Sequence, residues 1–118
     1  MEYLLLIYNN ETEMDKMSQA ELGAMYQEFM AFNDCIQKSG NHRAGKQLQP
    51  VSNATTVRVR DGKRGVTDGP FAETREQLGG FYMIEAKDLD EALAIAERIP
   101  SARSGSVEVR PIVSRNGS

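Results

Sequence analysis

A short apolar strand followed by a capped amphipathic helix occurs twice in this chain, and this repeated order constrains its fold most. Residues 3–8 are apolar on both faces, which predicts a central, doubly covered strand. Residues 9–17 are polar and predict a loop. Ser18 and Glu21 then match a capping box, in which each side chain binds the other residue's exposed backbone N–H. Apolar residues at helical spacing over residues 22–36 predict the first helix.

The second occurrence begins at residues 81–86, which are again apolar and predict a second central strand. Asp88 and Glu91 repeat the capping-box pattern and predict the start of a second helix. Pro100 predicts its end, because the residue before a proline is restricted to extended backbone. Alternating apolar and charged residues over 106–112 predict the last strand.

A β-hairpin is predicted between the two halves. Residues 41–49 are ambiguous and are interpreted as a short, irregular strand. Residues 54–60 alternate and are rich in β-branched side chains, an Asp-Gly turn follows at 61–63, and residues 64–67 return as the second arm. The order β-α-β, hairpin, β-α-β predicts an α+β fold, the ferredoxin-like split βαβ with a β-hairpin insertion.

Two helices cover only one face of a four-stranded sheet, so this single domain of residues 1–118 leaves one sheet face to explain. Strand alternation is interpreted as placing on that face Tyr8, Arg58, Tyr82, Glu108 and Arg110, beside the apolar Leu4, Leu6 and Ile84. A broad patch of this kind is unfavourable in water, and the same face of a second copy can cover it. We expect a homodimer whose paired sheets enclose a small-molecule cavity, the alternative being a monomer with a sufficiently polar face.

Composition argues against several classes of partner. The net charge of −3, the pI near 5.2 and the absence of a basic stripe predict no nucleic-acid binding. Cys35 is the only cysteine, which excludes an intramolecular disulfide and a cysteine-rich metal site. No apolar segment approaches the ~20 residues of a membrane span, and no signal-type segment is present. We expect a cytoplasmic protein with no membrane partner, no cofactor and no bound metal.

Residues 67–81, T-D-G-P-F-A-E-T-R-E-Q-L-G-G-F, resemble the signature of the DGPF family, a branch of the YciI-like (YCII-related) proteins. The likeness also includes residues 3–8, 48–50, 54–58 and 107–111. It implies a dimeric α/β-barrel fold, in agreement with the order of elements above. The wider group has been proposed to act through a paired His and Asp. A few relatives carry out elimination chemistry, such as dehydrochlorination of a hydroxylated aromatic.

Asp68 and His42 are the candidate catalytic residues, because the resemblance implies a paired His and Asp. Asp68 matches the aspartate of the Asp-Gly-Pro-Phe element, as a general acid or base at a cavity mouth; alternatively its carboxylate caps the turn before Pro70. His42 is the only imidazole, the side-chain type that changes charge near neutral pH. It matches no family motif, and beside Arg43 it is alternatively an exposed loop residue.

Further residues are predicted to bind a substrate: Glu73, Arg75, Glu76, Tyr82, Arg58 and Arg110. The first three form a charged cluster on a loop that glycine and proline hold at both ends; solvated loop charge is the alternative, with ion pairs worth less than ~1 kcal/mol. The two strand arginines bind an anion or pair with Glu108. Tyr82 donates a hydrogen bond into the cavity or only adds contact area. Cys35 and the methionines and aromatics of the first helix are interpreted as core residues.

Three functions follow from this reading. The first is an enzyme of lyase or elimination type, with Asp68 transferring a proton in a cavity of the homodimer; it predicts a partly buried Asp68. The second is a non-catalytic metabolite-binding or regulatory module, which predicts that turn hydrogen bonds occupy the Asp68 carboxylate. The third is a haem- or oxygen-handling enzyme, which requires His42 to point into the cavity.

Overall fold

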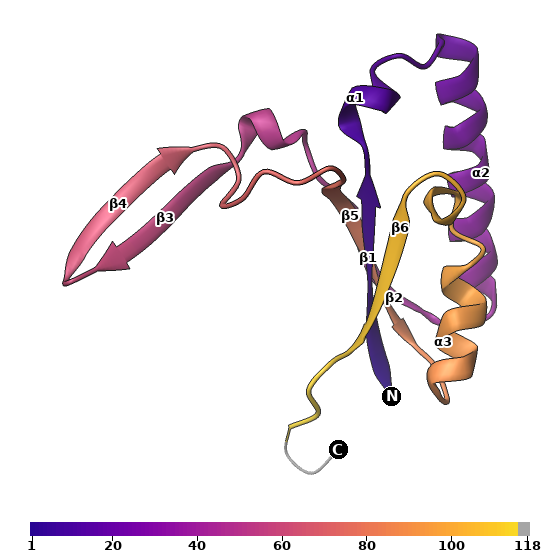
Figure 1. Cartoon of the computed structure of the whole chain (residues 1–118). Coiled ribbons are helices and arrows are strands. Elements are labelled where there is room, and N and C mark those ends of the chain that lie inside the picture. Colours follow the sequence, from indigo (N-terminus) through magenta and orange to yellow (C-terminus); the bar gives the residue numbers. More distant parts are fainter. Residues whose placement is uncertain (116–118) are drawn as a thin grey trace.

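The computed structural model describes residues 1–115, while residues 116–118, the end of the predicted domain, lie outside the described part. The predicted order of strands and helices is confirmed (Figure 1). The elements are β1 (Glu2–Asn9), α1 (Glu11–Met14), α2 (Gln19–Lys38), β2 (His42–Gln47), β3 (Thr55–Arg60), β4 (Lys63–Asp68), β5 (Gln77–Glu85), α3 (Leu89–Ala96) and β6 (Ser106–Pro111).

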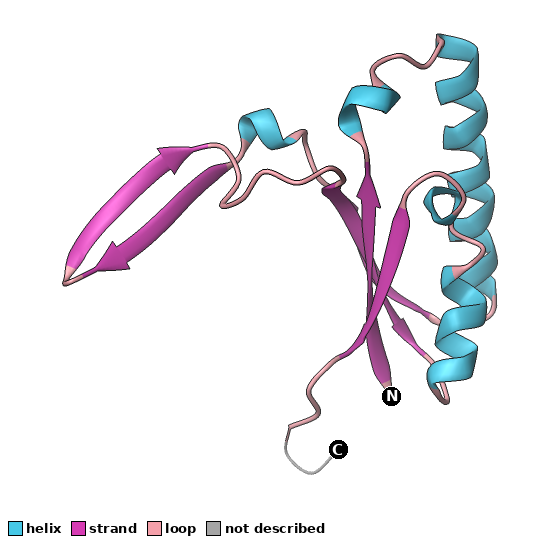
Figure 2. Ribbon diagram, viewed as in Figure 1, coloured by secondary structure: helices cyan, strands magenta, loops and turns pink. Residues whose placement is uncertain are grey.

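The main sheet has four strands in the order β2-β5-β1-β6, and all neighbouring strands are antiparallel. This α+β arrangement is compatible with a ferredoxin-like fold. The helices α2 and α3 cover one face of the sheet, and β3 and β4 form a separate two-stranded sheet that projects on the other side (Figure 2). Within residues 1–115, no helix combines the length and the apolar character needed to cross a membrane.

The helix caps explain why α2 and α3 begin where they do. At α2, the N–H of Glu21 donates to Ser18 Oγ over 3.1 Å, and the N–H of Ser18 donates to Glu21 Oε1 over 2.9 Å, so the predicted capping box is confirmed. At α3, Asp88 Oδ1 accepts from the N–H of Glu91. The carboxylate of Glu91, however, accepts from the N–H of Lys87 rather than from Asp88, so the second box is displaced by one residue.

Two boundaries differ from the sequence expectation. The loop predicted at 9–17 contains the short helix α1, which begins because Asn10 Oδ1 caps its first turn over 3.1 Å. β5 begins at Gln77, earlier than predicted, because its first residues pair with the end of β1. Gly79 and Gly80 therefore lie inside a strand rather than before it, a placement that matters for the site.

The hydrophobic core lies between the sheet and the two helices. β1 contributes Tyr3, Leu5 and Ile7, and pairing places Tyr82 opposite Leu5 and Ile84 opposite Tyr3 on the same, helix-facing side. The expectation that Tyr82 and Ile84 lie on the uncovered face is therefore wrong. Strand alternation has two possible phases, and the register of β5 against β1 selects the phase in which these two side chains are buried.

The uncovered face of the sheet carries mixed apolar and charged side chains. Leu6 lies opposite Phe81 and Glu108. In the next row on the same face, Leu4 lies opposite Met83 and Arg110. The Arg110 Nε donates to Glu108 Oε2 over 2.7 Å, so the predicted Arg–Glu pair forms, but within β6 rather than across strands. Arg58 lies on β3, outside this sheet, which corrects its predicted place on the uncovered face.

Candidate functional site

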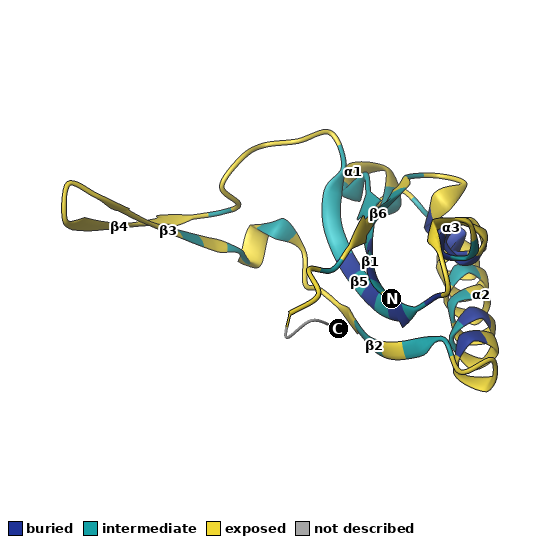
Figure 3. Ribbon diagram, turned by 90° about the horizontal axis from the view of Figure 1, so that it is seen from below, coloured by how far each residue is buried: buried dark blue, intermediate teal, exposed yellow. Residues whose placement is uncertain are grey.

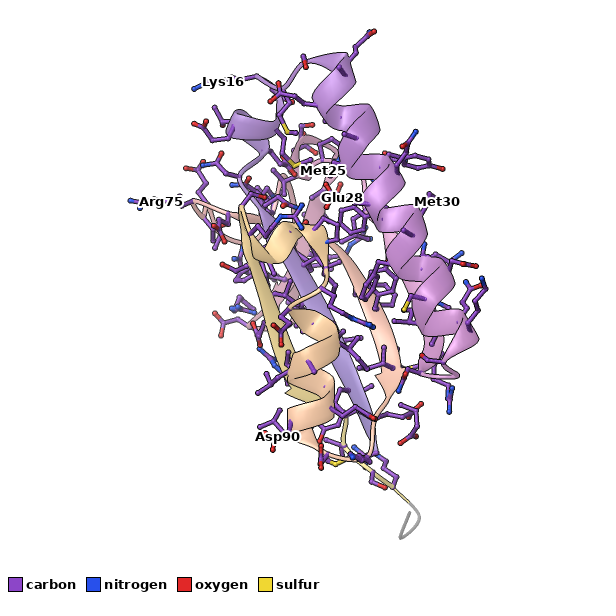
Figure 4. All side chains as sticks on the ribbon, turned by 90° about the vertical axis from the view of Figure 1, so that its right-hand side faces the viewer. Lys16, Met25, Glu28, Met30, Arg75 and Asp90 are labelled. Carbon is purple, nitrogen blue, oxygen red and sulfur yellow. The ribbon has the colours of Figure 1, made fainter. Side chains whose placement is uncertain are left out.

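A groove of about 470 Å³ lies between one face of α2, from Leu22 to Gln37, and the β2–β5 edge of the sheet. Figure 4 shows this side of the molecule, with Met25 and Met30 labelled on α2. The apolar part of the helix wall consists of Leu22, Met25, Tyr26, Phe29 and Met30, and the polar Asn33 and Gln37 continue it toward the end of α2. Only Phe32 and Ile36, nearer the end of α2, are buried in the core. The prediction that the methionines and aromatics of this helix are core residues is therefore wrong for the exposed Tyr26 and Met30, whereas Phe29 packs partly against the core.

Three glycines, Gly45, Gly79 and Gly80, are among the residues that line the sheet side of the groove. Gly45 is paired with Tyr82 and Gly80 with Ile7, so both glycines occupy helix-facing positions. A Cβ at Gly80 would stand 2.9 Å from the backbone oxygen of Lys46, a separation that real side chains essentially never adopt. The groove exists because the long side chains of α2 lie opposite residues that have none.

A small number of polar groups line the same groove. They are Asn9, Asn33, Gln37, His42, Lys46, Gln47 and Tyr82. The half-buried ring of His42 meets Tyr82 edge-on, with ring centroids 6.3 Å apart, and Tyr82 meets Phe32 edge-on at 5.2 Å. Burial raises the pKa of the Tyr82 phenol above its ordinary value of 10.0, so it stays protonated and can donate a hydrogen bond.

Asp68 lies elsewhere, as the last residue of β4, where it is exposed and paired with Thr55. No residue of the described range 1–115 donates a hydrogen bond to its carboxylate. The backbone of this turn is held instead by the N–H of Gly69, which donates to the Ala54 carbonyl over 2.7 Å. In a single protomer Asp68 is thus neither a turn cap nor partly buried, and it does not line the groove that holds His42.

The sequence pattern of the YCII-related domain family matches residues 1–116, nearly the whole chain. This chain belongs to the YCII-related family. It is also 39% identical to a protein of Rhizobium meliloti (strain 1021) that is named as an uncharacterised protein; the similarity extends over 114 residues, 95% of this chain and 92% of the relative.

The charged loop of this YCII-related protein does not act as one cluster. Glu73 lines a wide hollow of about 1230 Å³ between the base of the β3–β4 hairpin and the upper end of the sheet. Glu76 accepts a hydrogen bond from Ser106 Oγ over 2.8 Å, and Arg75 is exposed. Arg58 donates to the Phe71 carbonyl over 3.2 Å. Each contact ties the loop or hairpin to its neighbours, and the structure does not bring these side chains to His42.

Two further observations complete the site of the YCII-related protein. Cys35 is exposed, and its Sγ accepts a long hydrogen bond of 3.6 Å from Arg98, so its interpretation as a core residue is wrong. Among residues 1–115, no group of three or more His, Cys, Asp or Glu side chains is placed to hold a metal ion. The feature that sequence reasoning missed is the groove itself; its signal was a glycine pair inside an apolar strand together with a methionine-rich helix.

Proposed function

We propose that this YCII-related protein is a cytoplasmic homodimer that binds a small, largely apolar molecule carrying a hydroxyl or carboxylate group. The observation that supports this proposal is the groove under α2. Its volume of about 470 Å³, its apolar wall and its few convergent polar groups are the usual makeup of a small-molecule site. Met25 and Phe29 would contact the apolar part of the ligand, and Asn33, His42 and Tyr82 would bind its polar end.

The catalytic form of the proposal is an elimination. A base removes a proton from one carbon of the ligand, the electron pair left behind forms a double bond, and the leaving group departs from the adjacent atom with its bonding electrons. His42 is the imidazole that lines the groove, a side-chain type that commonly acts as a general base, and the Tyr82 phenol can bind the ligand oxygen. Asp68 lies outside the groove of its own protomer, so its participation requires the second copy of the chain.

Binding without catalysis is the alternative, and one observation favours it. Within residues 1–115, the only groups lining the groove that can exchange a proton are His42, Lys46 and the two tyrosines Tyr26 and Tyr82. Among residues 1–115 no carboxylate lines the groove, whereas the proposed family mechanism uses a paired His and Asp. A metabolite-binding or regulatory module needs no such pair.

Thermal denaturation against a panel of small phenols and carboxylic acids tests the site. A ligand at 100 times its Kd adds about 2.7 kcal/mol of stability, enough for a clear rise in Tm. Met25→Glu places a charge in the groove wall, and Ala24→Glu places the same charge on the adjacent, exposed residue of α2. We expect Ala24→Glu to keep the rise and Met25→Glu to lose it. The binding proposal is wrong if no compound raises Tm, or if both variants respond alike.

Product analysis separates the enzyme from the binding module. With a β-halogenated carboxylic acid that raises Tm, the enzyme form predicts that halide and the α,β-unsaturated acid are released together, and that Asp68→Asn slows this release while the rise in Tm remains. His42→Asn changes a residue that also binds the ligand, so it is expected to reduce both the release and the rise in Tm. The binding form predicts no release by the wild-type protein. Halide release that is unchanged in Asp68→Asn would remove Asp68 from the mechanism and leave His42 as the base.

A further inference from the structure

Residues 55–68, which comprise β3, β4 and their turn and are here called the arm, make this protomer unusually extended. The arm projects away from the sheet and helices and is mostly exposed (Figures 1 and 3). The radius of gyration is 16.4 Å, against about 13.5 Å for a compact chain of this length. The accessible surface is 8487 Å², against about 6,400 Å² for a compact monomer of this mass. The excess of about 2,000 Å² is comparable to what one subunit buries in an obligate dimer.

The two faces of the arm differ in chemistry. Val57 lies opposite Val66, and Val59 lies on the same face opposite Arg64, while the other face carries Arg58 and Arg60. The three valines, here called the valine face, are 61%, 53% and 62% exposed in the order Val57, Val66 and Val59. An isolated two-stranded hairpin is at best marginally stable in water, because it has no packed apolar face. The valine face therefore needs a surface to cover it.

The uncovered face of the main sheet is on the same side of the molecule as the arm. The helices lie on one side of the sheet and the arm extends from the other, as both Figure 1 and Figure 3 show. The rows of Leu4 and Met83, and of Leu6 and Phe81, face this space. The arm and the sheet thus border an open space between them. A second protein molecule bound to the uncovered sheet face could therefore also contact the arm.

The distribution of charge favours a second copy of this chain as the binding partner of the arm. The arm carries four basic and two acidic side chains, a net charge of +2. The whole chain carries −3, so the other residues together carry −5. The arm of one copy is therefore attracted to the body of another. A two-fold axis makes this attraction reciprocal, because the same two surfaces then meet twice.

We propose that the arm is an exchanged element, whose valine face packs against the body of a second copy of this chain. This inference rests on the homodimer of the proposed function and assigns its contact surface. Asp68 lies on the same arm face as Val66, so the exchange would carry its carboxylate out of water and into the interface. Its exposure is then a property of the single protomer.

The closing experiment compares two neighbouring residues of β4 that point to opposite faces. Val66→Asp places a carboxylate on the valine face, and Thr67→Asp places the same charge on the other face. Sedimentation equilibrium of the full chain, from nanomolar to micromolar concentration, measures the dimer Kd. We expect Val66→Asp to raise the Kd by at least about tenfold, because an unpaired carboxylate becomes buried, and Thr67→Asp to change it by less than about threefold.

Amide hydrogen exchange of residues 55–68 supplies a second readout. We expect these amides to be protected in the wild-type dimer and to lose protection in Val66→Asp, while β1 and β5 keep theirs in both. Equal Kd values for the two variants, or a wild-type dimer with an unprotected arm, would overturn the exchange and leave the dimer and the groove standing. A wild-type chain that stays monomeric at micromolar concentration would overturn both the exchange and the homodimer, whereas ligand binding in the groove is decided separately by the thermal shift.

Discussion

The ring of Tyr82 lies against the backbone of Gly45, so closely that a Cβ added at Gly45 would stand 2.8 Å from Cδ1 of the ring. The two residues are paired across β2 and β5. Glycine at this position lets the ring lie between Phe32 on one side and His42 on the other. The aromatic end of the groove therefore depends on the absence of a single methyl group.

Gly45→Ala is expected to displace the Tyr82 ring, because the added Cβ would stand 2.8 Å from it. The ring is buried, so this displacement disturbs its neighbours and lowers stability. The backbone oxygen of Phe81, 3.3 Å from the added Cβ, hinders relief in that direction. We expect a loss of about 1–3 kcal/mol in the free energy of unfolding, as for other overpacked sites. Urea denaturation measures the loss, and the near-ultraviolet circular dichroism of the aromatic residues reports the displacement. A variant with wild-type stability and an unchanged spectrum would contradict the tight contact.

Gly79 and Gly80 provide a matched pair. A Cβ at Gly80 would meet the backbone oxygen of Lys46 at 2.9 Å, whereas at Gly79 its nearest neighbour would be Asn9 Nδ2 at 3.7 Å. We expect Gly80→Ala to lower the free energy of unfolding by about 1–3 kcal/mol and Gly79→Ala by less than about 1 kcal/mol. Parallel urea titrations give both values. Equal losses would show that the close approach of the two strands is not what requires glycine at Gly80.

The capping box of α2 yields a prediction with a definite pH dependence. Hydrogen bonds from the backbone and side chain of Ser18 lower the pKa of Glu21 below its ordinary value of 4.5. A carboxyl whose pKa is lowered on folding stabilises the protein above its unfolded pKa, and this contribution is lost as the pH falls through the folded pKa. We expect Ser18→Ala to reduce stability by about 1 kcal/mol at neutral pH, and the difference from wild type to shrink as the pH falls below 4.5. Urea denaturation at several acidic pH values measures it; a constant difference would mean that the Ser18 side chain takes no part in lowering the Glu21 pKa.

Sequence reasoning reached the order of elements because that order is encoded locally. The Ser18 and Asp88 caps and the apolar runs at 3–8 and 81–86 are features of neighbouring residues. The face on which Tyr82 lies is not local, since it depends on how β5 is aligned with β1. The family was likewise predicted correctly, because its signature is a continuous segment.

The groove escaped prediction for the same physical reason. Met25 looks like a core residue in its own helix, and Gly80 looks like a strand boundary in its own strand. Only their position opposite each other across the α2–sheet interface makes a space. The environment of Asp68 is even harder to predict from neighbouring residues, because it depends on the direction in which the whole arm projects. The pairing of His42 with Asp68 stays a prediction.

Alkaline titration tests the burial of Tyr82. Burial raises the pKa of this phenol above 10.0, so the folded state resists its ionisation. A group whose pKa is raised on folding stabilises the protein below its unfolded pKa, and this stability is lost as the pH rises through the folded value. We expect Tyr82→Phe to remove from the tyrosinate absorbance a phenol that ionises above the ordinary pKa, and to weaken the loss of stability above pH 10.0. An unchanged titration curve would place this phenol in water.

The groove also bears on how firmly α2 is held. Phe32 and Ile36 are buried in the core and Phe29 packs partly against it, whereas Leu22, Met25 and Tyr26, nearer the start of the helix, line the groove and are not buried. A ligand bound in the groove would supply apolar contacts that the core does not make there, and this part of the helix would become less mobile. Ligand binding would then slow amide hydrogen exchange over residues 19–30, so the exchange rates at this end of the helix would report whether a ligand is bound.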